Sequence, residues 1–297
     1  MEIELPVPER IRGACEGRIS GCLLGKPVEG PSFRQGCEGL VPLLPAPAFA
    51  AVVCAGLLGV ASAPVTAEPT HYEDRNRYLA PRSADALVID GVADEAVWQA
   101  AEWHQIDQRW LGPEYSAEDF SGRFKVAWSA QRLYVLVEVV DDILFDSHRD
   151  PLVQYWDDDC VEIFIDEDYS GGDHQYNHNA FAYHMSLDNQ AIDMGTDERP
   201  HNYSQHVESR WKQTGHSVVW EFAIDIYTDD YVDSVNDNVP ITLHAGKVMG
   251  LMLAYCDNDG SELRENFVGS ESVPEGPKDR GWIDAGLFGE LQLVDTE

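Results

Sequence analysis

Basic residues are scarce in this sequence. Its 297 residues include 20 lysines and arginines against 53 aspartates and glutamates, which gives a formal net charge of −33. Nucleic acid phosphates and anionic membrane surfaces repel such a chain, because like charges raise the free energy of contact. The composition therefore excludes nucleic acid as a partner and gives no support for a membrane partner.

Cysteine and the common catalytic motifs are also sparse. The sequence has six cysteines but no C-x-x-C pair, and it lacks a P-loop, a G-x-G-x-x-G after a strand, an H-E-x-x-H and a G-x-S-x-G. These absences remove support for thioredoxin-like, nucleotide-binding, zinc-protease and serine-hydrolase functions. The abundant carboxylates leave a polysaccharide hydrolase as an alternative, because that chemistry needs two of them.

The charge is unevenly distributed along the chain. Residues 1–67 contain five basic and six acidic residues, so the acidic body begins near Glu68. Before it, residues 40–67 form an apolar run that ends in two A-x-A-like cleavage patterns, Ala61-Ser62-Ala63 and Val65-Thr66-Ala67. This pattern is typical of an export signal, with an uncleaved membrane anchor and a linker as alternatives. We expect a secreted or periplasmic protein whose mature start lies between Ala63 and Glu68.

Residues 1–39 have a different character. The stretch "ERIRGACEGRISGCLLGKPVEG", residues 9–30, resembles the opening helix and turn of ADP-ribosylglycohydrolase-like proteins. The helical domain that carries the magnesium ligands of that family does not follow, so the resemblance transfers no site residue. We expect residues 1–39 to be a non-globular leader and residues 68–297 to be the folded domain.

Short alternating segments dominate the chain after Tyr78. In "RFKVAWSAQRLYVLVEVVDD", the apolar residues Phe124, Val126 and Trp128 share one face, and the alternation resumes from Leu133 after a four-residue turn. This period of two predicts a hairpin with one buried side. Later segments such as "VEIFID" and "SVVWEFAID" continue the pattern, which predicts an all-β antiparallel sandwich. We also expect a turn at Asp90-Gly91 and a core position for Trp98.

Four motifs occur in a characteristic order: "VIDGVADEAVWQAA", "FKVAWSAQRLYVLVEVVDD", "YWDDDCVEIFID" and "RGWIDAGLFGELQLV". Together they resemble carbohydrate-binding module family 9, one of the DOMON-like, immunoglobulin-like β-sandwiches, over residues 87–294. The resemblance implies an exported, non-catalytic domain that binds a polysaccharide or oligosaccharide such as xylan or cellulose. It also implies attachment to polysaccharide-degrading enzymes and calcium in a structural role.

The family holds its sugar between two tryptophans, and Trp156 and Trp282 match those positions. Glu162 matches the family's acceptor for a sugar hydroxyl. These residue types suit a sugar, because aromatic planes pack on its C–H faces and carboxylates accept hydrogen bonds from its hydroxyls.

The sequence departs from the family at two further positions. The family's arginine and glutamine are replaced at or near Ala182 and Ala254. His184 and Asn258 are candidates to supply the missing hydrogen bonds. The identity of the sugar, and the choice between chain ends and interiors, therefore stay open.

Four aspartates are calcium candidates: Asp141, Asp142, Asp158 and Asp166. Calcium prefers several carboxylate and carbonyl oxygens, which acidic turns provide. The alternative is a solvated acidic surface without bound metal.

The two cysteines beyond residue 54 are Cys160 and Cys256. Each lies beside an acidic turn, on strands that the family places in one sheet. In an oxidising compartment the two are candidates for a disulfide, and two separate buried thiols are the alternative.

A second class of function is open to DOMON-like sandwiches, some of which hold a b-type haem between methionine and histidine ligands. Met185, Met194, Met252 and His184 are the residues that such a role would use.

Overall fold

The computed structural model describes residues 71–296, and short strands make up most of this part. The leader at 1–39 and the apolar run at 40–67 lie outside the described residues. The strands are β1 (Arg77–Pro81), β2 (His104–Ile106), β3 (Gln108–Leu111), β4 (Phe120–Trp128), β5 (Leu133–Asp141), β6 (Cys160–Asp166), β7 (Phe181–Ser186), β8 (Ala191–Met194), β9 (Pro200–Asn202), β10 (Val207–Thr214), β11 (Ser217–Ile224), β12 (Val248–Asp257), β13 (Asn266–Gly269) and β14 (Gly289–Val294). The short helices are α1 (Val97–Ala100), η1 (Arg280–Trp282) and η2 (Ala285–Leu287). No helix in this described part is long and apolar enough to cross a membrane.

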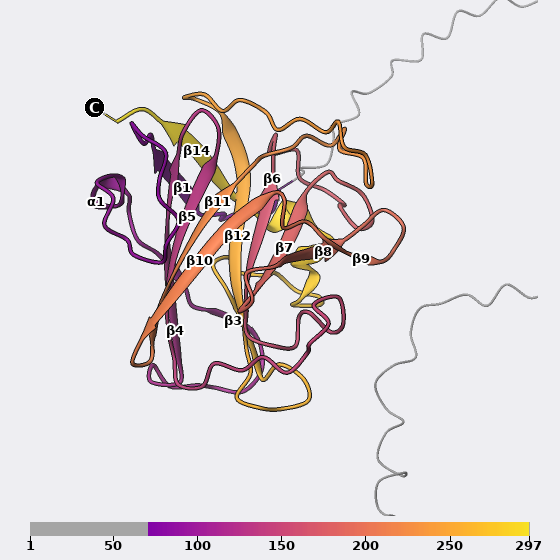
Figure 1. Cartoon of the computed structure of the whole chain (residues 1–297). Helices are drawn as coiled ribbons and strands as arrows, with labels where there is room; N and C mark the ends of the chain where they lie inside the picture. Colours follow the sequence, from indigo (N-terminus) through magenta and orange to yellow (C-terminus); the bar gives the residue numbers. More distant parts are fainter. Residues whose placement is uncertain (1–70, 297) are drawn as a thin grey trace, which may run out of the picture. The chain divides into compact units, whose positions relative to one another are not determined.

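The strands form two sheets that pack face to face (Figure 1). The smaller sheet has the order β10-β11-β5-β4-β2, and the larger one runs β1-β14-β12-β6-β7-β8-β9, with β13 paired to β12 and β3 paired to β13. The predicted all-β sandwich is thus confirmed. One pairing, β1 with β14, is parallel, which the sequence analysis did not predict. These are the first and last strands, and the long chain between them allows either a parallel or an antiparallel pairing.

The predicted hairpin is β4 and β5. Phe124 lies opposite Val137, and Trp128 lies opposite Leu133. These residues, with Val126, are buried between the sheets. The alternation of the sequence therefore reports the buried side of the hairpin correctly.

Both outer faces of the sandwich are partly covered. Trp98, only 2% exposed, packs with α1 on the outer face of the smaller sheet, so its predicted core position is confirmed. The predicted turn before it is also present: Gly91 has φ +77°, and a Cβ at this position would lie 2.8 Å from the backbone of Trp211. Any larger residue at Gly91 would strain the backbone, so the close approach of this turn to the sheet requires glycine.

The outer face of the larger sheet carries a second apolar cluster. Strand β6 alternates between the two clusters: Val161, Ile163 and Ile165 point into the core between the sheets, whereas Cys160 and Phe164 belong to the outer cluster. Glu162 lies between Cys160 and Phe164 on that outer face, because side chains alternate along a strand. The outer cluster is the base on which the candidate site is built.

Candidate functional site

A pocket of about 330 Å³ opens on the outer face of the larger sheet. This volume lies at the lower end of the range of small-molecule sites, about 300 to 1,000 Å³. Its lining is both aromatic and charged: Tyr155, Trp156, Glu162, His184, Asp193, Met194, Arg264, Phe267, Asp279 and Trp282.

Two tryptophans reach the pocket from separate elements. Trp156 lies in the turn before β6 and is 39% exposed. Trp282 ends η1 and is half-buried against the outer apolar cluster. Tyr155 packs edge-on against both Trp156 and His184, with ring centroids 4.8 and 4.7 Å apart. The pocket therefore has two indole surfaces. That of Trp282 is half-buried against the outer apolar cluster, and that of Trp156 is more exposed.

Three charged side chains meet at the base of the pocket. Glu162 faces His184 across the β6–β7 pair, and His184 Nε2 lies 3.0 Å from Glu162 Oε1. Arg264, from the loop between β12 and β13, approaches the same oxygen at 3.3 Å through Nη1. Cys256 Sγ also donates to this oxygen, at 3.1 Å. One carboxylate oxygen thus accepts from three donors.

The electrostatics of this group favour an ionised pair. Burial alone would raise the pKa of Glu162, but the charges of His184 and Arg264 outweigh it, so the pKa is lowered. Burial alone would lower the pKa of His184, but Glu162 outweighs it, so the pKa is raised. The pocket therefore holds a carboxylate that is only 2% exposed and is neutralised by neighbouring cations.

Asp193 adds a carboxyl of a different kind. Burial raises its pKa to about 6, although the backbone N–H groups of Ala182 and Met194 donate to it. A carboxyl with this pKa changes its protonation near neutral pH, so the pocket contains one acceptor whose charge depends on pH.

The structure brings four of the five predicted sugar-binding residues together: Trp156, Trp282, Glu162 and His184 line the pocket. Asn258 is not among the lining residues. It is 1% exposed, donates to the Asp157 carbonyl, and accepts from the N–H groups of Gly260 and Ser261. Its side chain closes the turn after β12, which leaves no group for a ligand.

Tyr155, Asp193 and Arg264 also line the pocket, although the sequence motifs did not predict them. Ala182 and Ala254 pack in the outer cluster, and Arg264 brings a guanidinium to the lining of the pocket from a loop. Arg264 could have been suspected from the sequence, because basic residues are scarce in this chain and a buried carboxylate such as Glu162 needs a cation nearby.

Cys160 and Cys256 are buried free thiols in the structure. They are direct register partners on β6 and β12, and both belong to the cluster beneath the pocket.

A separate group of carboxylates lies where three strands end. Asp141 ends β5, Asp257 ends β12 and Asp159 precedes β6, and oxygens of all three lie within 4.8 Å of one another. Burial, followed by repulsion from Asp141, raises the pKa of Asp159 to about 9 and that of Asp257 to about 7. No lysine or arginine of the described chain forms an ion pair with them.

A more exposed second group consists of Asp119, Asp142 and Asp259. Of the calcium candidates, Asp141 and Asp142 thus lie in such groups, whereas Asp158 and Asp166 do not. Asp158 accepts from the N–H groups of Ser147 and His148, and Asp166 from those of Asp168 and Gly171. The carboxylates of Asp158 and Asp166 thus accept hydrogen bonds from backbone groups of their loops. A short sequence pattern does not distinguish an aspartate in this role from one that binds calcium.

Comparison with known proteins places the whole sandwich in one family. A family model described as carbohydrate family 9 binding domain-like matches residues 89–296. The endo-1,4-beta-xylanase A of Thermotoga maritima is 33% identical over 208 residues, covering 70% of this chain and 17% of that protein. The exoglucanase XynX of Acetivibrio thermocellus is 25% identical over 214 residues, covering 70% and 16%. The match thus spans less than a fifth of these relatives.

Solved structures agree on the fold. A carbohydrate binding module of family 9 from Caldicellulosiruptor kristjanssonii, in complex with cellotriose, aligns with a TM-score of 0.55 at 20% identity. The alignment covers 75% of this chain and 95% of that one. The same module in complex with glucose gives the same TM-score and identity.

Proposed function

This chain belongs to the carbohydrate family 9 binding domain-like family, and from that membership we propose that it is a non-catalytic module that stacks a sugar between Trp156 and Trp282. The observation that carries the proposal is the pocket, in which both tryptophans and the Glu162 carboxylate line one volume of about 330 Å³. Aromatic planes take the C–H faces of a pyranose ring, and charged groups take its hydroxyls.

The charges of the pocket favour a neutral sugar. Arg264 and His184 are both engaged with Glu162, so no unpaired cation is left among them to attract an acidic sugar, and the whole chain carries −33. The relatives are named as a xylanase and an exoglucanase. We therefore assign β-linked xylo- or cello-oligosaccharides as the ligand class.

Geometry favours this role over haem binding. His184 Nδ1 lies 3.0 Å from the Ala182 carbonyl, and Nε2 lies 3.0 Å from Glu162. Both ring nitrogens are thus engaged, so neither is free to bind a haem iron. Met185 and Met252 are fully buried in two different clusters, and Met194 lines the pocket with His184, which has no free ring nitrogen to act as the second ligand. An absorption spectrum of the purified protein should show no Soret band, and the presence of such a band would favour haem binding.

Replacement of either tryptophan tests the proposal. Trp156→Ala and Trp282→Ala should each weaken binding by about 2 kcal/mol or more, roughly thirtyfold, because truncation removes the stacking area of an indole on one face of the sugar. The measurement is titration calorimetry with cello- and xylo-oligosaccharides, after a glycan array has identified the tightest ligand.

Trp98→Ala is the matched control. It should cost about 3 to 5 kcal/mol of unfolding free energy by leaving a cavity, with affinity retained in the folded fraction. Unchanged affinity in both pocket variants would place the sugar elsewhere.

Calcium at the ends of β5, β6 and β12 is a second part of the proposal. The donor set of Asp141, Asp159 and Asp257 fits a hard cation, because three buried carboxylates lack a counter-charge and calcium takes oxygen ligands. Bound there, the ion would supply the positive charge that keeps the three groups ionised. Asp119, Asp142 and Asp259 offer further oxygens nearer the surface.

We also propose that the protein is secreted or periplasmic, on the basis of the apolar run at residues 40–67 and its small-residue end. N-terminal sequencing of the native protein should find a start between Ala63 and Glu68. An intact Met1 on cytosolic protein would contradict this.

A further inference from the structure

The two thiols beneath the pocket are placed to form a bond with each other. Cys160 and Cys256 face one another across the β6–β12 pair, and their sulfur atoms lie within 4.8 Å. Directly opposed residues of an antiparallel pair have Cα atoms about 4.5 to 5.5 Å apart, which lies inside the range of about 4.4 to 6.8 Å that disulfides span.

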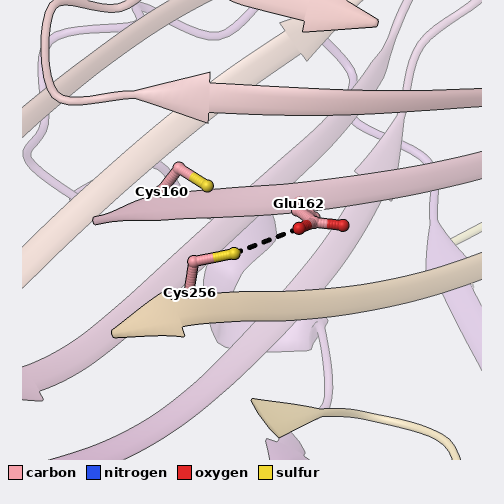
Figure 2. Close-up of side chains that lie close together, drawn as sticks. All are labelled: Cys160, Glu162 and Cys256. Carbon is pink, nitrogen blue, oxygen red and sulfur yellow. Dashed lines mark hydrogen bonds between the residues drawn. The ribbon is translucent and has the colours of Figure 1, made fainter. Parts of the chain in front are cut away.

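The same thiols are part of the hydrogen bonding of the pocket. In Figure 2 both sulfur atoms and the Glu162 carboxylate point to the same side of the sheet, and the dashed line joins Cys256 to Glu162. Cys256 Sγ also lies 3.1 Å from Arg264 Nη1. Cys160 and Glu162 are two residues apart on β6, which places them on one face.

A soft metal ion would find ligands in Cys160, Glu162 and Cys256, but a cation already lies there. Arg264 Nη1 contacts both Cys256 Sγ and Glu162 Oε1, at 3.1 and 3.3 Å. The guanidinium balances the carboxylate, so a metal would have to displace it. The contacts favour a bond between the sulfurs over a shared ion.

We propose that Cys160 and Cys256 form a disulfide when the chain folds in an oxidising compartment, and that this bond sets the affinity of the pocket for sugar. The coupling rests on the proposed function. In the reduced form Glu162 Oε1 accepts from His184, Arg264 and the Cys256 thiol. Each donor draws charge from the carboxylate and weakens it as an acceptor for a sugar hydroxyl. Oxidation removes the thiol donor, so the oxidised form binds sugar more tightly.

The chemistry is thiol–disulfide exchange with an external disulfide. The Cys256 sulfur attacks one sulfur of the oxidant and releases one thiol, and the Cys160 sulfur then attacks the mixed disulfide and releases a second. Two protein S–H bonds and one external S–S bond break; one protein S–S bond and two external S–H bonds form. Both thiols are at most 1% exposed in the folded protein. The exchange therefore takes place during folding, before β6 and β12 are buried.

The experiment uses the full chain, folded with calcium present and with either oxidised or reduced glutathione. Peptide mapping by mass spectrometry should find Cys160 linked to Cys256 only in the first sample. Calorimetry with cellotriose or the matching xylo-oligosaccharide should give roughly three- to tenfold tighter binding for the linked form, the effect expected of one hydrogen bond.

Two variants separate the bond from the thiol donor. Cys160→Ala removes the disulfide but keeps the Cys256 thiol, so it should bind like the reduced protein under either condition. Cys256→Ala removes both, so it should bind like the oxidised protein. Thermal melts of each variant identify loss of folding.

Each remaining outcome overturns a defined part of the proposal. Absence of the linked peptide rules out the disulfide, and equal affinity of the two forms rules out the coupling. If neither form binds any oligosaccharide, the proposed function fails and the coupling with it, while the peptide map still reports whether the thiols pair.

Discussion

Glu162 is the residue on which the hydrogen bonds of the pocket converge, and its ionisation depends on its neighbours. His184 has a raised pKa, so its contribution to stability is present below about pH 6.5 and is lost as pH rises through the raised value. Glu162 has a lowered pKa, so its contribution is present above about pH 4.5 and is lost as pH falls through the lowered value. The pair therefore stabilises the fold most between these limits.

A substitution of His184 should show this pH dependence. His184→Gln should lower the free energy of unfolding by about 1.5 to 3 kcal/mol at pH 6, because a charge-assisted hydrogen bond is lost. The loss should be smaller at pH 9, because the imidazole of the wild-type protein gives up its proton as pH rises through its raised pKa. Urea unfolding at both pH values measures the difference.

The control is His201→Gln, which removes a more exposed imidazole beside Asp197 and should change stability by less than about 1 kcal/mol. An equal loss for His184→Gln at both pH values would show that the contact with Glu162 contributes no charge interaction.

At the scale of strands, the ends of β5, β6 and β12 bring acidic side chains close together. Asp141, Asp159 and Asp257 bring three carboxylates from both sheets to one place. A cation there would tie the end of the smaller sheet to that of the larger one. Without a cation, the three carboxylates repel each other, so the folded state keeps some of them protonated.

Asp257→Asn should relieve that repulsion. Among the described residues, the Asp257 carboxyl accepts one long hydrogen bond, from Asn266 at 3.5 Å, so the amide loses little hydrogen bonding. In EDTA at pH 8 the variant should be about 2 to 4 kcal/mol more stable than the wild type, because the pKa of Asp257 is raised to about 7. It should also respond less to calcium in thermal melts.

Asp85→Asn, an exposed position outside the group, is the control and should change neither value. A variant that is destabilised in EDTA would contradict the repulsion.

For the molecule as a whole, these carboxyls predict an unusual dependence of stability on pH. Asp159 and Asp257 have pKa values raised to about 9 and about 7, so the folded state binds more protons than the unfolded chain. Metal-free protein should be most stable near pH 4 and should lose stability steadily as pH rises from there, up to about pH 7 for the contribution of Asp257 and about pH 9 for that of Asp159. The net charge of −33 acts in the same direction.

Calcium should reverse this trend, because it binds the ionised form. Melting temperatures from pH 4 to 9, in EDTA and in excess calcium, should diverge as pH rises, and magnesium should have a weaker effect since it releases its water less readily. Curves that run parallel in EDTA and calcium would show that the aspartates hold no calcium.

Features that depend on neighbouring residues could be predicted from the amino-acid sequence. Alternation along 124–139 placed Phe124 and Val137 in the core, and the Asp90-Gly91 pair marked a turn, because side-chain period and backbone freedom are local properties. The motif "YWDDDCVEIFID" likewise put Trp156 and Glu162 near one another.

Contacts between groups that are distant in the sequence became visible in the three-dimensional fold alone. Arg264 and Glu162 lie about a hundred residues apart, and so do Asp159 and Asp257; their contacts depend on strand register and on the path of a loop. The same dependence kept Asn258 out of the pocket and made β1 pair in parallel with β14. Sequence periodicity contains neither register nor loop path, because both follow from the packing of the two sheets as a whole.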